Sequence, residues 1–363
     1  MKRIILVFTA AMVMGLMMVA MALPVFAGGG DDDEDNESAS GGSTRNGQIV
    51  FRRWFDPDQT KGAIFTMNPD GSHVRQITHP KGWYDNIPAW SPDGKRITFH
   101  RQTSDFGTSR VMVVNPDTGD TRTVVPCTGE RCVYAFSPDF SPDGRSIAYD
   151  RTVAPPNAQD PPEWKLYSAI FIVGLDGENS HQVTSTPKRS KGQLATETEE
   201  PAFSPNGKML TFVRERRFPE ENTAVFVQPL GSPEDAHRIT PWKLNCLDHP
   251  EFSPDGKLVL FRCLPKGEEG PSNLYWVHPD GTGLHALTHA PAAKQYLGSS
   301  FSPSFNKGEG WITVGRTGGY GKEGNADVYR VRVEDGKVVR SVNLTKSAIW
   351  DSAPDWGTHP PVG

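Results

Sequence analysis

From residue 46 onward, apolar and polar residues alternate in short segments that recur along the chain. Each segment carries two large apolar residues two positions apart, so both fall on one side of an extended strand. The pairs are Ile97 and Phe99, Ile147 and Tyr149, Leu210 and Phe212, Val259 and Phe261, and Ile312 and Val314. This pattern predicts β-strands with one consistently apolar side.

A short motif, Pro-x-[Trp/Phe]-Ser-Pro-[Asp/Asn]-Gly-[Lys/Arg], precedes these strands. Its second Pro presets a turn, Asp accepts hydrogen bonds from nearby amides, and Gly tolerates a positive φ, so each copy predicts a tight hairpin. Four full copies begin at Pro88, Pro138, Pro201 and Pro250, and two reduced copies begin at Pro303 and Pro354. The leading prolines are 50, 63, 49, 53 and 51 residues apart, a period typical of propeller blades.

A second type of strand follows each motif, and in most copies it ends at an Asp-Gly turn. A short outer strand, such as 76–78, 286–288 or 343–345, comes after most of these turns. The segments are 63–71, 111–117, 169–177, 225–231, 274–281 and 327–336. Four strands in each of six units predict an all-β fold, a six-bladed β-propeller of four-stranded antiparallel blades.

The two ends of the repeat region complement each other. The last copy stops at Trp356 without a second strand, whereas the repeat region begins with the strand 46–53, in which Ile49 and Phe51 match Ile97 and Phe99. We therefore expect the N-terminal strand to complete the last blade and close the ring, which removes an exposed sheet edge.

The motif, together with the later Asp-Gly and Leu-Thr elements, resembles the propeller repeat of TolB, the periplasmic component of the Tol-Pal system. The resemblance covers about residues 46 to 357 and implies a TolB-like propeller, which we place at 46–360. TolB also has an α/β domain ahead of its propeller, and nothing before residue 46 is expected to form one. The resemblance is therefore to the propeller alone.

The N-terminal segment predicts export. Lys2 and Arg3 precede an apolar run from Ile4 to Leu23, and Val25-Phe-Ala27 suits a signal peptidase, so residues 1–27 are interpreted as a signal peptide cleaved after Ala27. The expected location is secreted or periplasmic, with membrane attachment only if the segment stays uncleaved. Residues 28–45, which carry an acidic run, are expected to form a disordered linker.

Charge and cysteine usage narrow the class of partner. The chain has a net charge of −5. Without the two basic residues of 1–27 and the six acidic residues between 28 and 44, the remainder carries −1, which gives no reason to expect nucleic acid as a partner.

Four cysteines in an exported chain favour disulfides. Their positions in the hairpin predict a disulfide between Cys246 and Cys263, which leaves Cys127 to pair with Cys132. A zinc site is the competing interpretation, although the spacing suits it poorly.

The candidate binding residues lie on the face opposite the Ser-Pro-Asp-Gly turns, called the variable-loop face because its connections differ most between repeats. Arginines recur at one position of the second strands, where Cys263 takes the sixth place: Arg53, Arg101, Arg151, Arg214 and Arg316. We expect Asp85 beside Arg101 and Glu197 opposite Arg214. The arginines either pair with neighbouring acids or line a pocket for a carboxylate or an anionic glycan.

Six acids precede the innermost strands and are expected to cluster at the channel mouth: Asp85, Glu197, Glu199, Glu200, Asp248 and Asp351. Such a ring would suit Ca²⁺, but acids paired with arginines need no metal. Aromatic residues such as Trp83 and Trp164 on this face suit protein or glycan contacts. The binding residues predicted are Trp83, Asp85, Arg101, Arg151, Trp164, Glu197, Glu200, Arg214, Asp248, Arg316 and Asp351.

The sequence has no Gly-x-Ser-x-Gly elbow, no His-Glu-x-x-His and no phosphate-binding glycine loop, and His79, His249, His285 and His289 are interpreted as structural. The leading hypothesis is therefore an exported, monomeric, non-catalytic propeller without a cofactor that binds an envelope or secreted protein, or a glycan. The alternative is an enzyme at the channel mouth, a lyase or glycan hydrolase that uses the carboxylate and arginine rings with Ca²⁺.

Overall fold

The computed structural model describes residues 46–127, 132–154, 166–185, 197–216, 222–264, 271–290, 295–317 and 325–363. The expected signal peptide (1–27), the acidic linker (28–45) and Trp164 lie outside these ranges. Within them, no helix has the length and apolar character that a membrane span requires.

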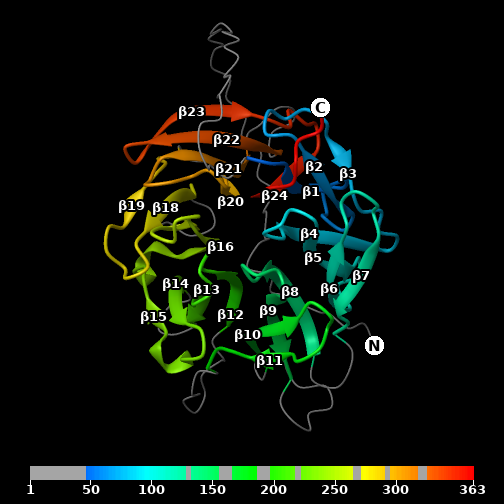
Figure 1. The fold of residues 1–363 in the computed structure, drawn as a ribbon, viewed down its shortest axis with the longest axis horizontal. Helices are drawn as coiled ribbons and strands as arrows, with labels where there is room; N and C mark the ends of the chain where they lie inside the picture. The colour runs from blue at the N-terminus through cyan, green and yellow to red at the C-terminus, as the bar shows by residue number, and fades with distance from the viewer. Residues whose placement is uncertain are drawn as a thin grey trace, which may run out of the picture. The chain divides into compact units, whose positions relative to one another are not determined.

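Six four-stranded antiparallel sheets are arranged as blades around a common axis, with one strand of each blade innermost (Figure 1). We number the blades along the chain: blade 1 combines β24 with β1–β3, and blades 2 to 6 are β4–β7, β8–β11, β12–β15, β16–β19 and β20–β23. The predicted six-bladed propeller is confirmed.

The strands occupy equivalent places in every blade. The innermost strands are β4 (Trp83–Trp90), β8 (Cys132–Phe140), β12 (Thr198–Phe203), β16 (Cys246–Phe252), β20 (Tyr296–Phe301) and β24 (Trp350–Trp356). The second strands are β1 (Ile49–Trp54), β5 (Ile97–Thr103), β9 (Ser146–Val153), β13 (Met209–Arg216), β17 (Val259–Cys263) and β21 (Gly310–Thr317). The third strands are β2 (Gly62–Met67), β6 (Ser109–Val114), β10 (Tyr167–Gly174), β14 (Asn222–Pro229), β18 (Asn273–Val277) and β22 (Ala326–Glu334). The outer strands are β3 (Arg75–Gln76), β7 (Thr121–Val125), β11 (His181–Gln182), β15 (His237–Arg238), β19 (His285–Ala286) and β23 (Lys337–Asn343), and two short 3₁₀ turns cover Pro233–Asp235 and Trp242–Leu244.

The ring closes through β24 and β1, as predicted from the ends of the repeat region. These strands pair antiparallel from Ile49 opposite Trp356 to Trp54 opposite Trp350, and the indole Nε1 of Trp356 donates to the Gly47 carbonyl at 2.8 Å. The chain then crosses to blade 2, where the imidazole of His359 stacks on Trp90 with ring centroids 5.1 Å apart. The C-terminal segment therefore joins the first two blades on the turn face.

The repeated turn owes its sequence to a local hydrogen-bond pattern. In blade 2 the Ser91 hydroxyl donates to the Asp93 carboxylate at 2.6 Å, and the backbone N–H of Lys95 donates to the same carboxylate at 3.1 Å. Gly94 has a φ of 68°, which a residue with a side chain rarely adopts. The motif is therefore a requirement of the hairpin and carries no information about function.

The copy assigned to Pro303 is out of phase, and the structure corrects it. Phe301 pairs with Ile312 as Trp90 pairs with Ile97, so Pro303 corresponds to the turn residue Pro92. Ser299 occupies the position of the leading proline. The sequence Pro303-Ser-Phe resembles the start of the motif by coincidence, because the proline that marks this start is missing in blade 6.

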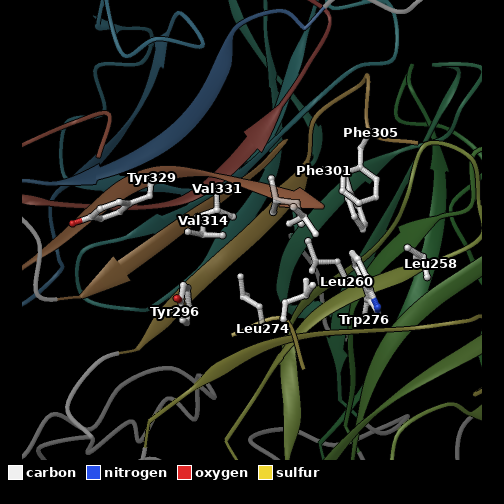
Figure 2. Close-up of a cluster of buried hydrophobic side chains, with 13 residues drawn as sticks. Leu258, Leu260, Leu274, Trp276, Tyr296, Phe301, Phe305, Val314, Tyr329 and Val331 are labelled. Atoms are coloured by element: carbon white, nitrogen blue, oxygen red, sulfur yellow. The ribbon is translucent and has the colours of Figure 1, made fainter. Parts of the chain in front are cut away.

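The core consists of layers between adjacent blades. All ten apolar residues named from the alternation pattern have an exposed fraction of 0%, which confirms the predicted buried strand side. Figure 2 shows the layer between blades 5 and 6, where Leu260 and Trp276 face Phe301, Val314 and Tyr329. These layers fix the distance between blades and give the axis a rigid frame.

Both predicted disulfides are present. Cys246 and Cys263 lie opposite each other on β16 and β17 and are bonded, and Cys127 is bonded to Cys132 between blades 2 and 3. No described cysteine is free. Two disulfides indicate an oxidising compartment.

Candidate functional site

Every innermost strand contains an irregularity near its middle. The pairing with the second strand shifts there, and one residue, or two in β16, adopts a positive φ, between 46° at Ser137 and 76° at Asp248. In five blades this residue directly precedes the leading proline: Ile87, Ser137, Glu200, His249 and Ala353. Because a bulge rotates the side chains on either side of it, these residues project differently from their neighbours in the strand.

Acidic side chains connect these bulges from blade to blade. The Asp150 carboxylate of blade 3 accepts the Glu200 N–H of blade 4 at 3.3 Å. Glu200 Oε2 in turn accepts the N–H groups of Asp248 and His249 in blade 5, both at 2.9 Å. Asp248 Oδ2 accepts the Gly298 N–H of blade 6 at 2.6 Å. Backbone donors exposed by the bulges are thus satisfied by carboxylates of the preceding blade.

Glu200, Asp248 and His249 form a compact group that we call the axial cluster. One ligand atom from each lies within 4.8 Å of the other two, and Glu200 Oε1 is 3.9 Å from His249 Nε2. The Arg262 guanidinium contacts Asp248 Oδ2 at 3.1 Å and donates to the Tyr296 carbonyl at 2.9 Å. The side chains of the cluster are 18% to 25% exposed, so solvent reaches them.

Two further acids, Asp150 of blade 3 and Glu199 of blade 4, lie next to the axial cluster. Burial raises the pKa of Asp150 to about 7, and burial, reinforced by the neighbouring carboxylates Glu197 and Asp150, raises the pKa of Glu199 well above its usual range. Negative groups are therefore concentrated on the side of the axis formed by blades 3 to 5.

Basic and aromatic groups occupy the opposite side. Arg52 of blade 1 donates hydrogen bonds to Asn86 and Ser352, and burial lowers its pKa to about 10 although Asp248 opposes that shift. His100 of blade 2 is 3% exposed and rests against the ring of Phe136 at 4.9 Å; burial, then Arg52 and His249, lowers its pKa to about 3. Because groups on non-adjacent blades interact, these side chains converge on the axis.

A second acidic set lies two residues beyond the bulge, toward the turn face. Asp139, Glu251 and Asp355 belong to blades 3, 5 and 1, and the equivalent residues of blades 4, 6 and 2 are Ala202, Ser300 and Ala89. Burial is the main cause that raises the pKa of all three acids, to about 7 for Asp139, and repulsion from the other acids of the set adds to the shift of Asp139 and Glu251.

The arginines named in the sequence analysis have mainly structural contacts. Arg101 binds Asp85 through two hydrogen bonds of 2.6 and 2.9 Å, which confirms their predicted adjacency, and Arg53 binds Asp351 at 2.7 and 2.8 Å. Both acids have an exposed fraction of 0%. Asp85 and Asp351 are therefore buried with their arginines, as the structural interpretation of the arginines expects, and their place in a binding ring at the channel mouth stays a prediction.

The remaining arginines cover aromatic rings of their own blades. The guanidinium carbon lies 5.3 Å from the Phe171 ring centroid for Arg151, 4.7 Å from Phe226 for Arg214, and 3.8 Å from Tyr329 for Arg316. The register places Thr198 rather than Glu197 opposite Arg214. The structural interpretation accounts for these contacts, and a binding role for the arginines stays a prediction.

Of the other predicted binding residues, Glu200 and Asp248 meet in the axial cluster. The Glu197 carboxylate is close enough to Glu199 to help raise the pKa of Glu199. Trp83 is half-buried beneath the Arg110 guanidinium, 4.7 Å from the ring centroid.

Several axial residues were missed by sequence reasoning. In the sequence analysis, His249 is interpreted as structural and Asp150, His100 and Arg52 are not selected, although these three directly precede the recurring arginines of the second strands.

The second acidic set had a visible signal, because the variable residue after the leading proline is acidic in three copies of the motif. With the copy at Pro303 aligned correctly, the sequence shows an acidic residue at this position in every second blade.

Solved structures with the same architecture include two TolB proteins. TolB from Acinetobacter baumannii is 19% identical, with a TM-score of 0.59 over 85% of this chain and 66% of that one. A protein assigned as TolB from Agrobacterium tumefaciens is 17% identical, with a TM-score of 0.53 over 83% of this chain and 89% of that one. The fold is that of the TolB propeller.

The same fold also occurs in an enzyme. Kuenenia stuttgartiensis hydrazine synthase matches with 14% identity and a TM-score of 0.61 over 88% of this chain and 48% of that one. No protein-family model and no curated protein matches the sequence. This chain spans slightly less than two thirds of the Acinetobacter baumannii TolB, and the TolB likeness therefore concerns the propeller.

Proposed function

We propose that this protein is an exported, non-catalytic TolB-like propeller that binds an envelope or secreted protein through its variable-loop face. The observation that supports the proposal is the group of partly exposed side chains near the axis, Glu200, Asp248 and His249, which bulged strands hold together with the partly buried Arg52. Such a surface favours charge-complementary recognition on a rigid frame.

Apolar residues flank the charged centre on the same face. Phe55 follows β1 and is 46% exposed, and Ile349 precedes β24 and is 37% exposed. Since β1 and β24 pair with Trp54 opposite Trp350, Phe55 and Ile349 lie at the same end of blade 1. A charged centre beside exposed apolar residues is a composition typical of protein contact sites.

Export is the second part of the proposal. The N-terminal basic and apolar pattern supports a signal peptide, and the two disulfides agree with a secreted or periplasmic location. Detection of the mature protein outside the cytoplasm with an N-terminus at Gly28 would support this part, and a cytoplasmic location would contradict it.

The face assignment is tested with the mature protein immobilised and exposed to envelope extract. A captured protein is purified, and its affinity is measured by biolayer interferometry. We expect Phe55→Asp with Ile349→Asp to weaken binding at least about tenfold, and Lys208→Glu on the turn face to leave it unchanged. Loss of binding only in the turn-face variant, or capture of no protein, would contradict the proposal.

A further inference from the structure

The axial cluster has the donor atoms of a metal site. Glu200, Asp248 and His249 each offer a ligand atom, and the three atoms lie within 4.8 Å of one another. Two carboxylates and an imidazole at this separation can all reach one ion after small side-chain rotations, because metal–ligand bonds of about 2.0 to 2.2 Å bring donors to similar mutual distances.

The cluster is held in place by contacts that use only part of its donor capacity. Glu200 Oε2 accepts two backbone N–H groups, and Asp248 Oδ2 accepts the Gly298 N–H and forms an ion pair with the Arg262 guanidinium. Within the described ranges, no hydrogen bond engages Glu200 Oε1 or Asp248 Oδ1. One oxygen of each carboxylate therefore fixes the geometry while the other remains available to an ion.

A second observation points to a ligand at the same place. His100 is 3% exposed, and its Nδ1 has no hydrogen-bond partner among the described residues. It lies opposite Asn86 in the β4–β5 pair, and the Asn86 side-chain oxygen accepts a hydrogen bond from Arg52 of blade 1. His100 packs against Phe136 of blade 3 and interacts electrostatically with His249, which brings a buried imidazole into the surroundings of the axial cluster.

We propose that Glu200, Asp248 and His249, supported by His100, bind one divalent first-row transition metal ion, with Zn²⁺ as the tightest of the common candidates. Imidazole nitrogen together with carboxylate oxygen suits Zn²⁺ and Mn²⁺, whereas Ca²⁺ takes oxygen ligands alone. Arg262 already compensates the charge of Asp248, which lowers the affinity for a cation. This site goes beyond the proposed protein contact and does not depend on it.

The test is calorimetric titration of the full mature protein, stripped of metal with a chelator, with Zn²⁺, Mn²⁺ or Ca²⁺ alone. We expect one Zn²⁺ per chain, weaker Mn²⁺ and no displacement of Zn²⁺ by millimolar Ca²⁺. His249→Ala and Glu200→Gln should each weaken Zn²⁺ binding by about 100-fold. His289→Ala, which removes an exposed imidazole elsewhere, is the matched control.

Folding is monitored separately through the thermal midpoint of each metal-free variant. Glu200→Gln keeps an oxygen for the two N–H groups, so it provides a folded variant if His249→Ala is unstable. Co²⁺ substitution adds a spectroscopic readout, since loss of visible absorption in His249→Ala would show that the imidazole is a ligand. Unchanged Zn²⁺ affinity in both variants, or a site that takes Ca²⁺ and no Zn²⁺, would overturn the proposal.

Discussion

Asp355 of blade 1 accepts the backbone N–H of Trp90 in blade 2 at 2.6 Å. The same relationship joins Asp139 to the Phe203 N–H at 3.0 Å, and Glu251 to the Phe301 N–H at 3.3 Å. Acids of blades 1, 3 and 5 thus bridge to blades 2, 4 and 6, while the reciprocal positions hold small residues. The ring has six blades, but this particular carboxylate-to-backbone hydrogen bond repeats every two blades.

This arrangement predicts a pH dependence of stability centred on Asp139. Burial raises its pKa to about 7 in the folded protein from 3.8, so the folded state binds the proton more tightly than the unfolded chain. Its contribution to the free energy of unfolding is fully present below pH 3.8 and is lost as the pH rises through about 7. Urea unfolding at pH 5 and pH 8 measures the loss.

Asp139→Asn should reduce the loss of stability between pH 5 and pH 8 by about 3 kcal/mol, since about two pKa units of about 1.4 kcal/mol each lie between pH 5 and the folded pKa. Asp58→Asn, at an exposed loop position, is the control and should leave the profile as it is. An unaltered profile in Asp139→Asn would show that another group causes the dependence.

The buried pair of Asp85 and Arg101 predicts a large effect of removing one partner. Asp85→Ala leaves the Arg101 guanidinium without its carboxylate acceptor within blade 2, and we expect a loss of about 3 kcal/mol in the free energy of unfolding. Lys257→Ala removes the exposed partner of Asp255, whose ion-pair distance is 3.7 Å, and should cost less than about 0.5 kcal/mol. Equal effects measured by urea unfolding would mean that the Asp85 pair adds nothing to stability.

Ring closure depends on Trp356, which is 4% exposed and packs in the layer with Ile49 and Phe51. Trp356→Ala should lower the free energy of unfolding by about 3 to 5 kcal/mol, through lost packing and the lost bond to Gly47. Trp311→Ala removes a half-buried tryptophan at the edge of the same layer and should cost clearly less. Thermal unfolding measures both losses, and equal losses would mean that the effect of Trp356 is not specific to ring closure.

The two disulfides should contribute unequally. They close loops with sequence separations of 17 residues for Cys246–Cys263 and 5 for Cys127–Cys132. The loop-entropy model gives about 3 kcal/mol for the longer loop and about 2 kcal/mol for the shorter one. Denaturant unfolding of the two double Cys→Ala variants measures the difference, and a larger loss from the short loop would contradict the loop-length argument.

The sequence by itself determined the blades, their number, the closing strand and both disulfides. These features rest on local rules, because the two-residue period of a strand assigns Ile97 and Phe99 to one side, and the Ser-Pro-Asp-Gly turn fixes the pairing of adjacent strands. Where the local signal was imitated, as at Pro303, the assignment slipped by four residues without changing the number of blades.

Only the tertiary structure decided which acids face the axis. Asp85 and Glu200 both lie shortly before a leading proline, yet Asp85 is buried with Arg101 whereas Glu200 belongs to the axial cluster. Asp85 lies before the bulge of its strand, whereas Glu200 lies in the bulge of its own strand. A bulge rotates the strand locally, and a shift of one residue moves a side chain to the opposite side of a sheet. The partners of Glu200 come from blades 3 and 5, and contacts between residues about 50 positions apart form only when the ring is assembled.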